Sequence, residues 1–136
     1  MSDLDIVVID KRRSPPLSVI QLDGRLNMRN SDRLMEEIEG VIRGGTHHII
    51  LDLRGLISLT SAGLRVMLQA YKILGIGEEG TSTAPATSRR GEGPARSPYL
   101  KIVSPPPHVA EILRIAGFDR LMDIFDTLDA AFNSFA

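Results

Sequence analysis

The chain has 136 residues, a formal net charge of −1 and no cysteine. This length suits a single domain spanning residues 1–136, and the absence of cysteine excludes disulfides, thiolate metal ligands and cysteine nucleophiles. The near-neutral charge and an aromatic content of 4% argue against a nucleic-acid partner, because they supply neither a basic field nor many rings for base stacking.

The N-terminal segment predicts a β-hairpin. Apolar residues alternate or run together at 4–9 and again at 17–22, as they do in strands. The two strands are separated by a Ser-Pro-Pro turn, which is short enough to make them antiparallel neighbours. The polar, glycine-containing segment at 23–27 is expected to be a loop.

A helix and a central strand follow the hairpin. Apolar residues fall at helical spacing over 31–43, and Asn30 or Ser31 can cap this helix. The next segment, 48–53, is almost continuously apolar. Such a run is typical of a strand covered on both faces.

A second helix is expected to begin at Thr60-Ser61 and to end near Gly75. Residues 75–98 then change in character, because Ile76 is the one large aliphatic residue among Gly, Pro, Ser, Thr, Ala and charged residues. This composition predicts a flexible surface insertion. A kinase target or docking segment is the alternative that its Ser, Thr and Arg residues leave open. The Gly-x-Gly-x-x-Gly spacing at 75–80 is interpreted as a helix stop and linker, because it does not connect a strand to a helix.

Regular structure is expected to resume after the insertion. The pattern predicts a strand at 99–103, a helix opened by prolines at 105–107, a short strand at 121–125 and a last helix at 127–135. An opening hairpin followed by alternating helices and strands indicates an α/β fold with a mostly parallel sheet.

The sequence offers no catalytic or metal-binding pattern. His47 and His48 are adjacent at the start of a strand, so their side chains point to opposite faces and cannot share one metal ion. His108 has no second ligand at a suitable spacing. Ser/His/Asp, Glu-x-x-His and Walker patterns are also absent from the sequence. We therefore expect a binding protein without catalytic residues, metal or cofactor.

The residues Thr60 and Ser61 are the strongest candidates for a functional site. A hydroxyl at the start of a helix can cap the free amides of the first turn. It can also be phosphorylated, because the positive end of the helix tolerates a dianion that a docked partner would not. The residues alone leave both interpretations open.

Three motifs form a family signature. They are Leu-Asp-Gly-Arg-Leu-Asn at 22–27, the apolar strand at 49–53 and Thr-Ser-Ala-Gly-Leu-Arg-Val at 60–66. With these motifs the chain resembles the STAS domain family, in particular the bacterial anti-sigma factor antagonists, over nearly all its length except 75–98. The resemblance implies a mixed, mostly parallel sheet of about five strands, with an opening hairpin and about four helices packed on it.

The resemblance also implies a switch at Ser61. In this family an anti-sigma factor with serine kinase activity phosphorylates the signature serine, and the phosphorylated antagonist releases that partner. A PP2C-type phosphatase restores binding, so sigma-factor-dependent transcription is regulated by partner switching. ATP then belongs to the kinase, and this chain has no enzymatic role. The implied partner-binding surface consists of Gly24, Arg25, Leu26, Asn27, Met28, Thr60, Ser61, Ala62, Gly63, Leu64 and Arg65.

The chain departs from the family pattern at two positions. Thr60 and Asn27 stand where acidic residues are often found, so negative charge is removed beside the site, and Thr60 becomes an alternative phosphoacceptor. A constitutive STAS subunit of a transport or stress-signalling complex is the alternative function, and a nucleotide or small-molecule binder is a third. Since the sequence has neither a signal peptide nor an apolar run of about 20 residues, we expect a cytoplasmic protein without a membrane segment.

Overall fold

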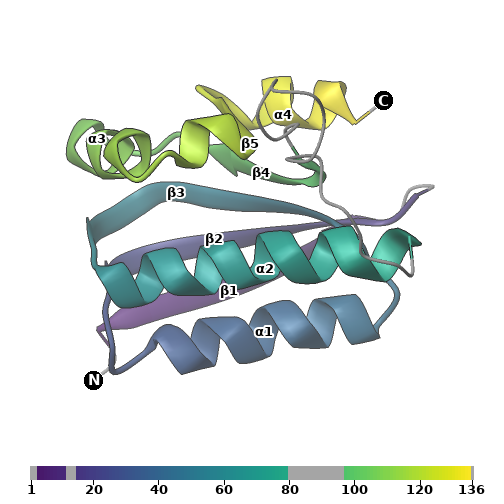
Figure 1. Cartoon of the computed structure of the whole chain (residues 1–136), viewed down its shortest axis with the longest axis horizontal. Coiled ribbons are helices and arrows are strands. Elements are labelled where there is room, and N and C mark those ends of the chain that lie inside the picture. Colours follow the sequence, from purple (N-terminus) through teal and green to yellow (C-terminus); the bar gives the residue numbers. More distant parts are fainter. Residues whose placement is uncertain (1–2, 12–14, 80–96, 136) are drawn as a thin grey trace.

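The computed structural model of the chain describes residues 3–11, 15–79 and 97–135. Within these ranges, five strands form one sheet in chain order (Figure 1). The strands are β1 (Leu4–Lys11), β2 (Leu17–Leu26), β3 (His48–Leu59), β4 (Ser97–Val103) and β5 (Met122–Phe125). β1 is antiparallel to β2, and every later neighbouring pair is parallel. The predicted mixed sheet with an opening hairpin is therefore confirmed.

Four helices pack on the sheet of the described part of the chain. They are α1 (Ser31–Arg43), α2 (Ser61–Glu79), α3 (Pro107–Ile115) and α4 (Leu128–Ser134), and a short 3-10 helix, Phe118–Arg120, precedes β5. α1 and α2 lie side by side along the sheet (Figure 1). The number and order of helices agree with the expected STAS-like architecture.

Alternation along the strands divides the buried residues into two cores. In β2, Ile20 and Leu22 belong to the larger core with α1, α2 and α3, whereas Leu17 and Val19 belong to a smaller core with α4. All four side chains are 99–100% buried, because β2 lies inside the sheet and is covered on both of its faces.

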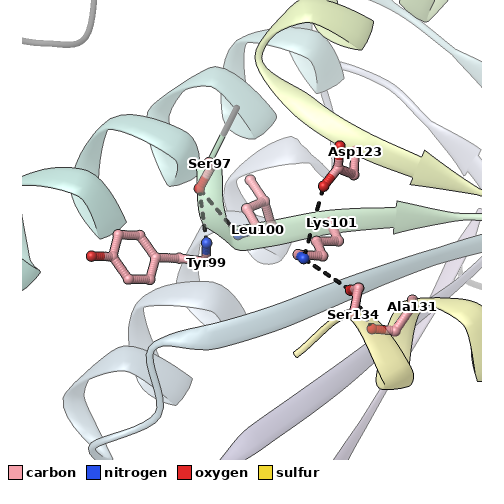
Figure 2. A network of polar contacts seen from close by, with 7 residues as sticks. All are labelled: Ser97, Tyr99, Leu100, Lys101, Asp123, Ala131 and Ser134. Atoms are coloured by element: carbon pink, nitrogen blue, oxygen red, sulfur yellow. Dashed lines mark hydrogen bonds and ion pairs between the residues drawn. The ribbon is translucent and has the colours of Figure 1, made fainter. Parts of the chain in front are cut away.

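A buried lysine fastens α4 to the sheet (Figure 2). Lys101 of β4 is 6% exposed, and its Nζ donates to Ser134 Oγ at 2.9 Å. The same ammonium lies 3.8 Å from Asp123 Oδ2 and 4.4 Å from the ring centroid of Phe135. A carboxylate, a hydroxyl and an aromatic face together offset the cost of burying this charge.

The expected loop at 23–27 is wrong for most of its length, since β2 continues to Leu26. Gly24 pairs with Leu4 in the sheet and has φ of +117°. A Cβ atom at Gly24 would clash with the carbonyl oxygen of Asp3. The glycine therefore permits a close strand-to-strand approach at this point.

β3 is also longer than the predicted strand at 48–53, because it continues to Leu59. Its pairing with β2 shifts register twice, between Gln21 and Asp23 and between Gly24 and Arg25. Each shift is a bulge that adds one residue to β3, and together they break the apolar alternation that would otherwise have indicated a longer strand.

α2 does not end at Gly75 as expected, since it continues to Glu79. β4 begins at Ser97, so residues 97 and 98 also belong to regular structure. These bounds correct both ends of the expected insertion at 75–98. Residues 80–96 lie outside the described residues, and the flexibility expected there stays a prediction.

Candidate functional site

The ends of β2 and β3 meet at the start of α2. Leu26, the last residue of β2, pairs with Leu59, the last residue of β3. The backbone amide of Thr60 then donates to the carbonyl of Leu26 at 3.2 Å. The structure therefore brings the two predicted groups of site residues, 24–28 and 60–65, together at one corner of the sheet.

The two hydroxyls at this corner have different surroundings. Thr60 Oγ1 donates to the Leu26 carbonyl at 3.2 Å, and the Thr60 carbonyl accepts from the amide of Leu64 at 3.1 Å. Thr60 thus precedes the first helical residue, but its hydroxyl bonds to the neighbouring strand. Ser61 is the first residue of α2 and is exposed, and among the described residues its hydroxyl has no hydrogen-bond partner. Of the two interpretations left open, a side-chain cap is not formed by either hydroxyl among the described residues.

Gly63 allows α2 to start directly against the sheet. A Cβ atom at this position would lie 2.7 Å from Leu26 and 2.7 Å from Leu59. Both leucines are buried, at 0% and 6% exposure, so neither can move aside into solvent. The small residue two positions after Ser61 thereby fixes how closely the helix N-terminus approaches the strand ends.

The segment that joins β2 to α1 is held by asparagine side chains. Asn30 Oδ1 accepts from the amide of Asn27, and Asn30 Nδ2 donates to the carbonyl of Arg25, both at 2.9 Å. Asn27 Oδ1 in turn accepts from the amide of Arg29 at 2.9 Å. Met28, at the turn, is 79% exposed. These bonds give the segment one shape beside Thr60.

Asn30 occupies the expected N-cap position of α1, but it makes no capping hydrogen bond. Its buried side chain instead holds the site segment. The sequence offered Asn30 or Ser31 as the cap: the structure has Asn30 at the N-cap position without a capping bond and Ser31 as the first residue of the helix. An asparagine three residues after Asn27 was the available signal, because asparagine amides readily bond to nearby backbone.

The corner carries positive charge. Arg25, Arg29 and Arg65 are all exposed, and none forms an ion pair with a carboxylate of the described residues. The sequence has no acidic residue at 24–31 or at 53–77. The two segments that meet at this corner therefore contribute three exposed arginines and no carboxylate, although the exposed Asp23 and Asp32 flank the first segment.

Two of the histidines make structural contacts. His48 packs edge-on against Phe135 at 4.9 Å between ring centroids, and a ring nitrogen of His108 bonds to the carbonyl of Ile57. Within the ranges given above, no group of three or more His, Cys, Asp or Glu side chains could hold a metal ion.

Two hollows lie apart from the corner. One, of about 240 Å³, lies between β1 and the C-terminal half of α1, where Asp10 and Glu37 line it. The other, of about 120 Å³, is lined by residues including Asp52 and Arg54. Neither has a predicted site residue in its lining. None of the helices in the described portion of the chain is long and apolar enough to cross a membrane.

Comparisons with known proteins identify the family. Residues 8–77 match the STAS domain. A putative anti-sigma factor antagonist, BtrV of Bordetella bronchiseptica, is 30% identical over 84% of this chain and 82% of its own length. The crystal structure of an anti-sigma factor antagonist from Mycobacterium paratuberculosis has a TM-score of 0.71, with 19% identity over 97% of this chain and 93% of that one. The Bacillus cell fate determinant SpoIIAA in its phosphorylated form has a TM-score of 0.63, with 16% identity over 96% of this chain and 100% of that one.

The two solved structures share the fold, while the family match and the BtrV relative extend the likeness to the sequence itself. The matched residues 8–77 include the corner formed by β2, β3 and the start of α2. The chain belongs to the STAS domain family, and within it to the anti-sigma factor antagonist type.

Proposed function

We propose that the chain is an anti-sigma factor antagonist that is switched off by phosphorylation of Ser61. The observation that carries the proposal is the unbonded, exposed Ser61 hydroxyl at the first residue of α2. A kinase can reach such a hydroxyl without breaking a hydrogen bond of the fold. Thr60 is a poorer acceptor, because its phosphorylation would remove the bond from its hydroxyl to the Leu26 carbonyl, one of the two that Thr60 makes to the end of β2.

The position of Ser61 also accounts for a switch that leaves the fold intact. A phosphate adds a charge of about −1.5 to −2. At the start of a helix of 19 residues it meets free amides and the positive end of the helix dipole, so the folded chain tolerates it. A partner docked over the same corner would have to bury that dianion, which costs several kcal/mol. Release of the partner follows from this difference.

The remaining parts of the switch lie on other proteins. The partner is an anti-sigma factor with serine kinase activity, which supplies ATP, and a PP2C-type phosphatase removes the phosphate. The name of the BtrV relative supports an anti-sigma factor as the partner, and the phosphorylated form of SpoIIAA shows that a protein of the same fold can carry a phosphate. The chain acts as substrate and binder and performs no catalysis itself. Because protein phosphorylation by such a kinase uses cytoplasmic ATP, the proposal places the chain in the cytoplasm.

Phosphate mapping by mass spectrometry tests the proposal. The full chain is incubated with the cognate anti-sigma factor kinase and ATP, alongside the variants Ser61→Ala and Thr60→Ser. We expect phosphate on Ser61 in the wild type and in Thr60→Ser, and none in Ser61→Ala. Phosphate on Thr60 in the wild type, or no phosphate at either residue, would contradict the proposed switch.

A further inference from the structure

Large apolar side chains are exposed on both sides of Ser61. In the described residues the exposed large hydrophobics are Val7, Met28, Ile57 and Ile115. Met28 lies in the segment after β2, whose Leu26 carbonyl bonds to Thr60. Ile57 lies near the end of β3, four residues before Ser61, and its side chain is 53% exposed. Met28 therefore lies in the segment that follows β2, and Ile57 lies in the last part of β3, the two elements whose ends meet at the candidate site.

The exposure of Ile57 follows from the second bulge of β3. Gly24 pairs with Leu56 and Arg25 pairs with Ser58, so Ile57 is the extra residue between them. Its side chain leaves the core, while Leu56 and Leu59 remain buried. Bulges often redirect a side chain in this way beside functional sites.

A contact from α3 holds this bulge in place. The Nε2 of His108 donates to the carbonyl oxygen of Ile57, since a carbonyl can only accept. The bond joins the backbone of β3 to the first turn of α3. The backbone that carries Ile57 is thereby already fixed in the free protein. Less conformational entropy is then lost when a partner binds.

Exposed arginines lie beside these apolar residues in the sequence, in the sheet and on α2. Arg29 is adjacent to Met28, Arg25 pairs with Ser58, and Arg65 is one helical turn after Ser61. Protein interfaces commonly have an apolar centre and a polar rim, and opposite charges on the two rims accelerate association. These arginines call for an anionic rim on the partner.

We infer that Arg29 and Ile57 belong to the docking surface, and that its partner is a protein face with an apolar centre and an acidic rim. This inference rests on the proposed function and specifies the face of the anti-sigma factor that the chain recognises. A phosphate of about −1.5 to −2 at Ser61 would cancel about half to two thirds of the positive charge of Arg25, Arg29 and Arg65. The negative phosphate would be repelled by the acidic rim of the partner. Its bulk would also prevent the partner face from fitting over Ser61.

Binding kinetics with the purified anti-sigma factor kinase test the inference. Arg29→Glu and Ile57→Ser are compared with wild type and with two matched controls, Arg43→Glu at the far end of α1 and Val7→Ser on β1. Arg29→Glu is expected to slow association about tenfold at low salt, with a smaller effect at high salt. Ile57→Ser is expected to accelerate dissociation about tenfold. Both controls should stay within about twofold of wild type.

The outcomes separate the two proposals. Failure of the unphosphorylated wild type to bind the kinase would overturn the proposed function, and with it this inference. Wild-type binding that neither Arg29→Glu nor Ile57→Ser alters beyond its control would overturn the inference alone. So would equally tight binding of the wild type to heparin at the same salt, because the arginines would then attract any polyanion. Thermal unfolding of each variant confirms that its fold is intact before the rates are compared.

Discussion

Replacing Gly63 by alanine tests the packing that sets the start of α2. The new Cβ would lie 2.7 Å from carbons of Leu26 and Leu59. Ordinary carbon–carbon contacts are about 3.5–4.0 Å, so the helix or the leucines must move by roughly 1 Å. Such overpacking costs about 1–3 kcal/mol. Alanine regains up to about 1 kcal/mol of helix propensity over glycine.

We therefore expect Gly63→Ala to lower the free energy of unfolding by about 1–2 kcal/mol, measured by urea denaturation with an unchanged m-value. Gly75→Ala, in the same helix, is the matched control, because nothing lies within 4 Å of its added Cβ. That variant should gain about 0.5–1 kcal/mol. If Gly63→Ala is as stable as Gly75→Ala, the close approach of α2 to the strand ends is not a constraint and the reasoning fails.

Three further predictions concern charge. Ser61→Asp should weaken binding to the anti-sigma factor while leaving the thermal midpoint nearly unchanged, because a carboxylate is favourable at a helix N-terminus; a large loss of stability would show that Ser61 is structural. Lys101→Met should lower the free energy of unfolding by about 1–3 kcal/mol and speed hydrogen exchange in α4, because it removes the contacts of the ammonium with Ser134 and Asp123. The control Lys72→Met, at an exposed position of α2, should change neither quantity. The hydrogen bond and charge of Arg114 lower the pKa of Glu111, so this pair contributes stability above the unfolded glutamate pKa and loses it as pH falls through the lowered value. NMR titration should give a higher carboxyl pKa in Arg114→Gln, and an unchanged pKa would refute the pairing.

The sheet could be predicted from the sequence because its strands contain long apolar runs. The segments at 48–53 and 99–103 needed no knowledge of their neighbours to be identified as strands. The ends of β2 and β3 could not be predicted in this way. Gly24 and two bulges in β3 interrupt the pattern there, and the reason for each is a contact across the sheet.

The sequence predicted which two segments meet at the candidate site, but it did not predict the hydrogen bonds that their residues make there. The resemblance pointed to Ser61 with Thr60 as the alternative, but the bond from the Thr60 hydroxyl to the Leu26 carbonyl, which separates the surroundings of the two, appears only in the structure. In the sequence, Asn30 indicates a helix cap; in the structure, its side chain bonds to the backbone of Asn27 and Arg25 instead. The bond of Thr60 depends on the long-range pairing of Leu26 with Leu59, which local propensity cannot predict, whereas the contacts of Asn30 are local and only the choice between them and a helix cap was open.

The affinity of the chain for its anti-sigma factor kinase, before and after phosphorylation of Ser61, tests the central proposal most directly. Calorimetry with the purified partner should give an affinity at least about tenfold weaker for the phosphorylated chain, equivalent to about 1.4 kcal/mol or more. Phosphatase treatment should restore the original value. Equal affinities for the two forms would contradict the switch and favour a constitutive STAS subunit.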